Sequence, residues 1–274
     1  MVLTRRPAVL HSVLAVTILI ACLWPEGVVA SGPAKGLDDF SVRTWNENDG
    51  LFASRISAIE QDADGYLWLG TDVGLVRFDG VRFVPITQIG NVSLPTANVP
   101  TLLSAQDGSL WIATVGQIGL VRWRNGVATT YGQAQGLDES YAMALLEDRS
   151  GVMWAGTRAG VFRFDGARWR AVEDTPGLTG TAVMALFESS DRKLWAADQG
   201  THKILGYDLD GHFLYSWGSW GEYPGGMWGV HGMSTDQEGN FYVAEVNNGR
   251  VQKYRPRPGA NPAFLVGKPW KGVW

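Results

Sequence analysis

Residues 62–80 read DADGYLWLGTDVGLVRFDG, and closely similar stretches follow at residues 105–126 and 147–166. Each copy has a turn of the Asp-Gly type, a short apolar run around a tryptophan, and a second turn. The central aromatic residue recurs along the chain at spacings of 43, 43, 41 and 47 residues. These five anchors are Trp68, Trp111, Trp154, Trp195 and Tyr242. A period of this length indicates repeated structural units.

Neighbouring positions repeat together with the anchors. A pair of residues at a predicted turn stands four and three positions before each anchor. These pairs begin at Asp64, Asp107, Ser150, Asp191 and Glu238. A small residue stands two positions after it, at Gly70, Ala113, Gly156, Ala197 and Ala244. Four short strands in about 43 residues are typical of a β-propeller blade, in which small residues fit near the crowded axis. We interpret the anchors as structural wedges between blades.

The predicted fold is therefore all-β, a β-propeller with five recognisable four-stranded blades across residues 54–256 and five or six blades in total. Ahead of the first blade, FSVRTW (Phe40 to Trp45) is similar to the outer strand of a blade. This segment either closes the ring by pairing with the C-terminal blade or joins FLVGKPW (264–270) in a degenerate sixth blade. The sequence leaves both arrangements open.

The N-terminus has the features of a secretory signal peptide. Arg5 and Arg6 precede an apolar run from Val13 to Leu23, and small residues then allow cleavage after Ala30. We predict a signal peptide over residues 1–30, a single propeller domain over residues 31–274, and a periplasmic or secreted protein. Two alternatives stay open, namely a lipoprotein anchored through Cys22 and a twin-arginine signal. Because Cys22 is the only cysteine, disulfides and cysteine-bound zinc are not expected in the mature chain.

Charge excludes one further class of protein. The chain carries 23 Lys and Arg against 27 Asp and Glu, a net charge of −4, and it contains no basic run. Nucleic acid is therefore not expected as a partner. No apolar stretch after the signal peptide is long enough to span a membrane, so no membrane span is expected in the mature protein.

The stretch at residues 62–80 and its two copies resemble the two-component regulator propeller repeat, and the resemblance covers about residues 45–172. That family supplies extracytoplasmic sensor domains of bacterial hybrid sensor kinases. The resemblance implies a sensor-type propeller that binds a ligand or a partner. No kinase or DNA-binding segment follows, so we expect a propeller without its own output domain.

The last third resembles NHL repeats, over about residues 190–268 within a region of NHL-like blades at 173–268. LWAADQGTHKILGYDLDGHFLYSWG and WGVHGMSTDQEGNFYVAEVNNGRVQKYRPRPG are similar to bacterial propellers related to peptidyl-α-hydroxyglycine α-amidating lyase. That family binds zinc through histidines near the axis, which implies a metal-dependent lyase as an alternative function. In GVHG, His231 matches one such ligand and is the only candidate for a metal site.

The remaining residues do not complete that zinc site. His231 lies eleven positions before its anchor, and the other blades have Ser57, Pro100, Met143 and Met184 at this offset. His202 and His212 fall in turns elsewhere, and the family's catalytic tyrosine is missing from ADQGTHK. Zinc needs three or four converging ligands. We therefore predict no metal, no cofactor and no catalytic residue, and favour a protein without catalysis of its own.

One loop breaks the repeat. YSWGSWGEYPGGMWGVHG (Tyr215 to Gly232) accounts for the longest anchor spacing and is rich in glycine and aromatic residues. Such a loop can stack against sugars or other planar ligands, or it can simply pack over the end of a blade. The predicted ligand-binding residues are Trp217, Trp220, Glu222, Tyr223, Trp228 and His231. The expected partner is a small-molecule or glycan ligand or a membrane sensor protein, with a non-catalytic scaffold as a further alternative.

Overall fold

The computed structural model describes residues 43–94, 98–116, 118–137, 141–172 and 182–268. Contacts between residues divide the chain into two units, Met1–Thr44 and Trp45–Trp274. The second unit is built from strands with three short 3-10 helices, η2 (Glu47–Asp49), η3 (Gln133–Gln135) and η4 (Pro262–Phe264). The described residues are thus all-β, as the sequence predicts.

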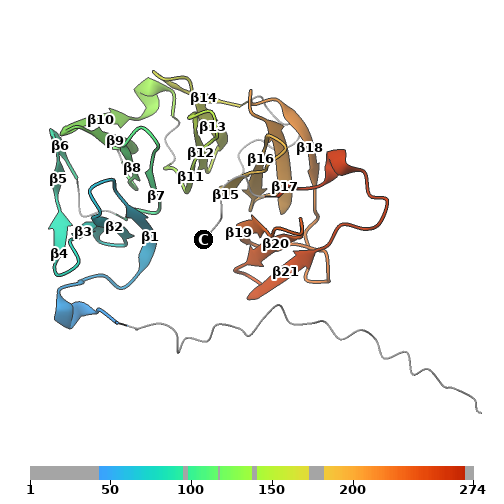
Figure 1. The fold of residues 1–274 in the computed structure, drawn as a ribbon, viewed down its shortest axis with the longest axis horizontal. Helices are drawn as coiled ribbons and strands as arrows, with labels where there is room; N and C mark the ends of the chain where they lie inside the picture. The colour runs from blue at the N-terminus through green and yellow to red at the C-terminus, as the bar shows by residue number, and fades with distance from the viewer. Residues whose placement is uncertain (1–42, 95–97, 117, 138–140, 173–181, 269–274) are drawn as a thin grey trace, which may run out of the picture. The chain divides into compact units, whose positions relative to one another are not determined.

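The strands fall into consecutive blades of a β-propeller (Figure 1). Blade 1 contains β1 (Ile56–Gln61), β2 (Leu67–Thr71), β3 (Gly74–Phe78) and β4 (Phe83–Ile86). Blade 2 contains β7 (Leu102–Ser104), β8 (Leu110–Ala113), β9 (Leu120–Arg124) and β10 (Val127–Tyr131). Blade 3 contains β11 (Ala144–Glu147), β12 (Met153–Thr157), β13 (Gly160–Phe164) and β14 (Trp169–Ala171). Blade 4 contains β15 (Val183–Glu188), β16 (Lys193–Asp198), β17 (Lys203–Asp208) and β18 (Phe213–Trp217). Blade 5 contains β19 (Val230–Thr235), β20 (Phe241–Glu245) and β21 (Arg250–Tyr254), and a small hairpin of β5 (Gln88–Ile89) and β6 (Val92–Ser93) follows blade 1.

Blade 5 differs from the expected four strands. Blades 1 to 4 are four-stranded antiparallel meanders, whereas the described residues of blade 5 form the order β19-β20-β21. After Tyr254 the chain reads RPRPG, and prolines lack the amide that a returning strand needs for its ladder. For the ring-closing strand, Phe40, Ser41 and Val42 lie outside the described residues, and Arg43–Trp45 belong to no strand. Ring closure stays a prediction.

The tryptophan anchors lie between neighbouring blades. Trp68, Trp111, Trp154 and Trp195 are all buried, and each packs against apolar residues of the following blade. Trp68, for example, contacts the cluster of Leu102 and Ile112 in blade 2. Tyr242 of blade 5 is only partly buried. Burial of one large aromatic ring at each blade boundary supplies much of the apolar packing that joins the blades.

Hydrogen bonds fix the orientation of the anchors. The Trp68 indole donates to Asp62 at 2.7 Å and the Trp154 indole to Asp148 at 2.8 Å, and the Tyr242 hydroxyl donates to Asp236 at 2.9 Å. Each of these aspartates also accepts backbone amides of its own turn. The turn that joins the first two strands of a blade is therefore tied to the anchor of the same blade.

Small residues permit close packing of the inner strands. A Cβ atom on Gly70 would lie 2.6 Å from the Val99 carbonyl oxygen, and one on Gly156 would lie 2.7 Å from a methyl carbon of Val183. Both distances are shorter than a real contact allows. Successive inner strands touch in the order β1, β7, β11, β15 and β19. The small residues after the anchors thus allow each blade to approach the next.

Candidate functional site

The loop between β18 and β19 is the most irregular described connection between two blades. Its two arms are joined by a parallel bridge between Trp220 and Met227, and the Met227 amide donates to the Ser219 carbonyl at 2.8 Å. A Cβ atom on Gly226 would lie 2.8 Å from the backbone carbonyl oxygen of Gly221, which is closer than a real contact allows. The glycines of this loop therefore allow the backbone to fold closely on itself.

The side chain of Arg250 in β21 binds the backbone of this loop. Its guanidinium donates to the carbonyl oxygens of Gly226 at 2.9 Å and of Gly221 and Tyr223 at 3.3 Å, and also to that of Glu222. A planar guanidinium with five N–H donors is suited to such a set of acceptors. One side chain of blade 5 thus binds four carbonyl groups of the loop backbone and fixes the loop to the sheet.

Glu245 completes this support. Its side chain is buried and accepts from the Arg250 Nε at 3.1 Å, the Trp228 amide at 2.9 Å and Asn248 at 2.6 Å. Burial disfavours the charged carboxylate, but these hydrogen bonds outweigh it and lower the pKa of Glu245 below its ordinary value of 4.5. A charged, fully paired carboxylate therefore underlies the loop at neutral pH.

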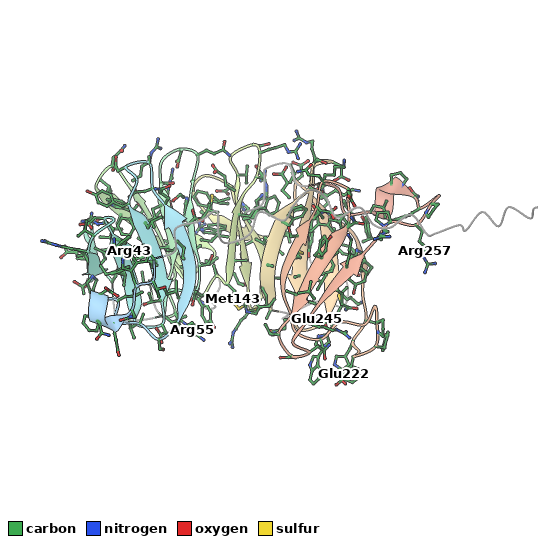
Figure 2. The ribbon with its side chains drawn as sticks, turned by 60° about the horizontal axis from the view of Figure 1, so that its bottom comes forward. Arg43, Arg55, Met143, Glu222, Glu245 and Arg257 are labelled. Carbon is green, nitrogen blue, oxygen red and sulfur yellow. The ribbon has the colours of Figure 1, made fainter. Side chains whose placement is uncertain are left out.

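The side of the loop that faces away from Arg250 and Glu245 presents aromatic rings to solvent. Trp220 is 60% exposed and Tyr223 is 56% exposed, while Trp228 is partly buried. The Trp220 and Trp228 rings meet edge to face with centroids 6.3 Å apart, and the Tyr223 hydroxyl lies 2.7 Å from the Ser219 hydroxyl. Figure 2 shows Glu222 at the free edge of this region, beyond Glu245. We call Trp220, Glu222, Tyr223 and Trp228 the aromatic loop surface.

Trp217 does not belong to this surface. It ends β18 and packs edge to face against Phe241 at 5.5 Å and Tyr254 at 5.3 Å, within the cluster between blades 4 and 5. In the sequence it stands close to Trp220, with only two residues between them. The strand, however, directs its ring toward the boundary between blades 4 and 5, so Trp217 lies apart from the aromatic loop surface, and a ligand contact of Trp217 stays a prediction.

His231 lies at a β-bulge of the inner strand. The ladder between β19 and β20 pairs Val230 with Glu245 and then Gly232 with Ala244, which leaves His231 unpaired and exposed. Blades 1 and 4 have the same irregularity at Ser57 and Met184, the residues at the same offset from their anchors. A bulge redirects the side chain of its extra residue. The offset singled out in the sequence is thus a structurally distinct position in these three blades.

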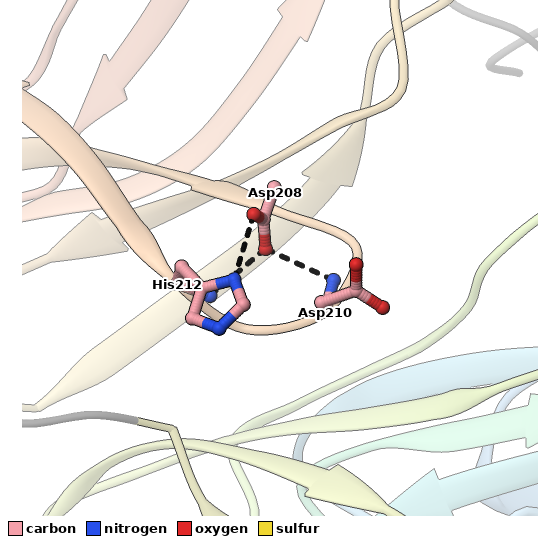
Figure 3. Close-up of side chains that lie close together, drawn as sticks. All are labelled: Asp208, Asp210 and His212. Atoms are coloured by element: carbon pink, nitrogen blue, oxygen red, sulfur yellow. Dashed lines mark hydrogen bonds and ion pairs between the residues drawn. The ribbon is translucent and has the colours of Figure 1, made fainter.

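The histidines do not gather around His231 within the described residues. The single group of three metal-ligating side chains found in the described part of the chain is Asp208, Asp210 and His212, at an outer turn of blade 4 (Figure 3). Asp208 accepts the Asp210 and His212 amides at 3.0 and 2.9 Å, and its other oxygen lies 2.9 Å from the His212 ring. These bonds are those of a hydrogen-bonded turn. That no metal binds stays a prediction.

Glu245 and Arg250 were not singled out in the sequence. Blades 1 to 3 carry threonine at the position of Glu245, and the Thr71, Thr114 and Thr157 hydroxyls donate to the carbonyl of a nearby glycine. Blade 5 replaces this threonine and glycine with an acidic and a basic residue that face each other in the ladder. Blade 4 also carries a charged pair at these two positions, Asp198 opposite Lys203. The contacts of Arg250 with the loop backbone are therefore what distinguishes this support, and no sequence pattern shows them.

Comparisons with protein families agree with this fold. The family model described as two component regulator propeller matches residues 50–73, and the NHL repeat model matches residues 227–254. The chain carries both repeat types. Both are repeats of β-propellers, and their matched segments lie in blade 1 and in blade 5 with its preceding loop. The resemblance to these two repeats in the sequence is thereby confirmed.

Solved structures share the fold at low sequence identity. The extracellular domain of the hybrid two component system BT3049 from B. thetaiotaomicron is 20% identical with a TM-score of 0.60, covering 82% of this chain and 31% of that one. Virginiamycin B lyase from Staphylococcus aureus is 16% identical with a TM-score of 0.52, covering 75% of this chain and 71% of that one. PorZ of Porphyromonas gingivalis, a surface component of the type-IX secretion system, is 13% identical with a TM-score of 0.56, covering 78% and 34%. The chain therefore spans about a third of the length of two of these proteins.

No curated protein matches the chain. Within the described residues, no helix combines the length and apolarity that crossing a membrane requires.

Proposed function

We propose that this protein is an extracytoplasmic, sensor-type β-propeller that binds a ligand at the aromatic loop surface. The repeat types and the fold shared with the extracellular domain of a hybrid two component system support the sensor class. Export through the N-terminal signal peptide, to the periplasm or beyond the cell, belongs to this proposal. The partner that receives the signal is a membrane sensor protein.

The observation that carries the proposal is the combination of exposed rings with a fixed backbone. Large aromatic side chains are normally buried, yet Trp220 and Tyr223 are more than half exposed. Their loop is held by the guanidinium of Arg250, so little conformational entropy is lost when a ligand binds. Aromatic faces of this kind stack against sugars and other flat ring systems, and Glu222 can accept hydrogen bonds from their hydroxyl groups. A glycan or another ring-containing polar molecule is the proposed ligand class.

A ligand screen by thermal shift tests the proposal, because a specific ligand raises apparent stability by mass action. For a ligand found in this way, the double variant Trp220→Ala, Glu222→Ala is expected to bind at least about tenfold more weakly. Its melting temperature is expected to be nearly unchanged. Phe52→Ala is the matched control, since Phe52 is a strongly exposed aromatic outside this loop. Full binding by the double variant would show that the loop only packs.

Metal analysis of the purified protein tests the lyase alternative. Tightly held metal near one equivalent that disappears in His231→Ala would favour a metal-dependent lyase. A protein without such metal that still binds a ligand through the aromatic loop surface supports the proposed sensor function. These two measurements are independent of each other.

A further inference from the structure

The outer edge of β21 lacks the partner strand that the other blades have. In blades 1 to 4 the third strand is paired on both sides, with a fourth strand running antiparallel along its outer edge. In blade 5 the described residues pair β21 only with β20. Unpaired strand edges are templates on which another extended segment can pair. Among the described residues, the outer edge of β21 is therefore open to a further strand.

An apolar cavity of about 550 Å³ adjoins this edge. It lies between blades 4 and 5, and its walls include the side chains of Tyr215, Trp217, Phe241, Tyr254, Phe264 and Leu265. The Tyr254 hydroxyl is buried and has no hydrogen-bond partner among the described residues, and burial raises the pKa of this group to about 12. The phenol therefore keeps its proton at neutral pH and remains a donor inside the cavity.

The other blades show what occupies the equivalent place. Blades 1, 3 and 4 place an aromatic residue of the fourth strand opposite the end of the third strand, at its last residue in blades 1 and 3 and its next-to-last residue in blade 4. The ring pairs are Phe78 with Phe83 at 4.3 Å, Phe164 with Trp169 at 5.1 Å, and Tyr207 with Phe213 at 5.8 Å. Trp169 is only 2% exposed in its position. Tyr254 is the corresponding residue of β21, so the cavity beside it has the place and lining for an aromatic side chain.

The rim of the cavity is cationic. Arg255 and Arg257 line it, both are exposed, and neither forms an ion pair within the described residues. Figure 2 shows Arg257 at the outer end of blade 5. A fourth strand starts at the turn that follows the third strand, so residues just before the aromatic one would lie near these arginines. Acidic residues are favoured there by charge complementarity.

We propose that the edge of β21 binds an extended peptide in which acidic residues immediately precede an aromatic residue. The peptide adds as the fourth antiparallel strand of blade 5, its aromatic ring fills the cavity beside Tyr254, and its carboxylates lie near Arg255 and Arg257. Main-chain hydrogen bonds then supply affinity while the cavity and the arginines supply specificity. This surface is distinct from the aromatic loop surface, and the proposal does not depend on the proposed function.

Fluorescence anisotropy with the intact protein tests this proposal. The probe is a fluorescein-labelled peptide of sequence Asp-Asp-Trp-Ser-Val-Thr-Val, which has the alternation of an outer strand. We expect saturable binding that weakens as salt is raised. Replacing the tryptophan of the peptide by alanine is expected to weaken binding at least about tenfold. N-methylation of alternate amides removes main-chain donors and is expected to abolish binding.

Charge reversal in the protein provides the matched test. The double variant Arg255→Glu, Arg257→Glu is expected to bind the acidic peptide about tenfold more weakly. It is expected to bind more tightly a peptide that begins with Lys-Lys in place of Asp-Asp. Arg82→Glu, an exposed arginine of blade 1, serves as the control and leaves both affinities unchanged. All three exchanges lie on the surface, so the variants are expected to fold.

Three results would overturn the proposal. The first is equal binding of the acidic peptide to the charge-reversed and unchanged proteins. The second is equal binding of the tryptophan and alanine peptides, which would show that the cavity is not used. The third is concentration-dependent self-association that the charge reversal abolishes, since this would assign the edge of β21 to a second copy of the chain.

Discussion

In blades 1, 3 and 5, one aspartate at the turn before the anchor both caps the turn and binds the anchor. Asp148 is fully buried, accepts the amides of Ser150 and Val152, and also accepts the indole proton of Trp154. The sequence indicates the turn, because Asp and Gly are typical of such positions. It does not indicate that the acceptor for the anchor lies six residues before it, since that bond depends on how the turn folds back over the ring.

Asp148→Ala is expected to lower the free energy of unfolding by about 2–4 kcal/mol, because it leaves a buried indole N–H and turn amides without acceptors. Denaturant titration measures this effect. Asp165→Ala is the matched control, because Asp165 caps an exposed turn of the same blade and its loss should leave the midpoint nearly unchanged. Equal midpoints for both variants would contradict the role assigned to the anchor bond.

Glu245 makes the loop sensitive to acid. Its pKa lies below the ordinary value of 4.5 in the folded protein, so the stabilisation that it provides is complete above pH 4.5 and is lost as the pH falls through the folded pKa. Below pH 4.5, we expect the amide hydrogen-exchange rate of residues 218–229 to rise relative to that of blade 3. Glu245→Gln should expose the loop at neutral pH and remove this pH dependence. An unchanged exchange rate in the variant would contradict the support assigned to Glu245.

At the scale of the elements, the spacing of the anchors predicted the strands, the turns and the blade boundaries, because these depend on local turn chemistry and on packing that repeats. The described residues of blade 5 form three strands where the sequence predicts four, and RPRPG marks the place where the strand pattern stops. Within the predicted site, the exposure of Trp220 follows from the loop, whereas the burial of Trp217 depends on the direction of β18. Arg250 binds carbonyl groups of a loop that lies 24 to 29 residues earlier in the chain, and no local sequence pattern shows such contacts.

Packing between two elements is tested by Trp111→Ala at the boundary of blades 2 and 3. The ring contacts Tyr131 at 5.4 Å and Phe164 at 5.4 Å and is buried. We expect a loss of about 3–5 kcal/mol in the free energy of unfolding, measured by chemical denaturation. Ligand binding by the fraction that remains folded should be normal. A stable variant with lost binding would instead make Trp111 a recognition residue.

At the scale of the whole propeller, each interior blade packs against two neighbouring blades and each terminal blade against one, as far as the described residues go. Ile59 of blade 1 is 60% exposed, whereas its equivalent in blade 2, Leu102, is 4% exposed. Val251 of blade 5 is 67% exposed, whereas Leu120 of blade 2 is fully buried. In repeat architectures, stability is approximately a sum of units and of the interfaces between neighbours. The terminal blades therefore have fewer stabilising interfaces.

Hydrogen exchange is expected to follow this order. Amides of β2 in blade 1 and β20 in blade 5 should exchange faster than those of β12 in blade 3, because opening a terminal blade breaks one interface and opening an interior blade breaks two. Mass spectrometry of peptides from a native-state exchange series measures this difference. Equal protection of all blades would show that the end faces are covered in solution, as ring closure requires.

The bulges of the inner strands have a consequence for how such a protein can change over evolutionary time. In blades 1, 4 and 5 the residue at the bulge takes part in no ladder pairing, and it is serine, methionine and histidine respectively. A substitution there alters what the strand presents while leaving the sheet register and the anchors intact. Gene duplication copies the scaffold of a blade together with this unconstrained position. New chemistry can then arise one blade at a time, without a loss of stability that would have to be compensated elsewhere.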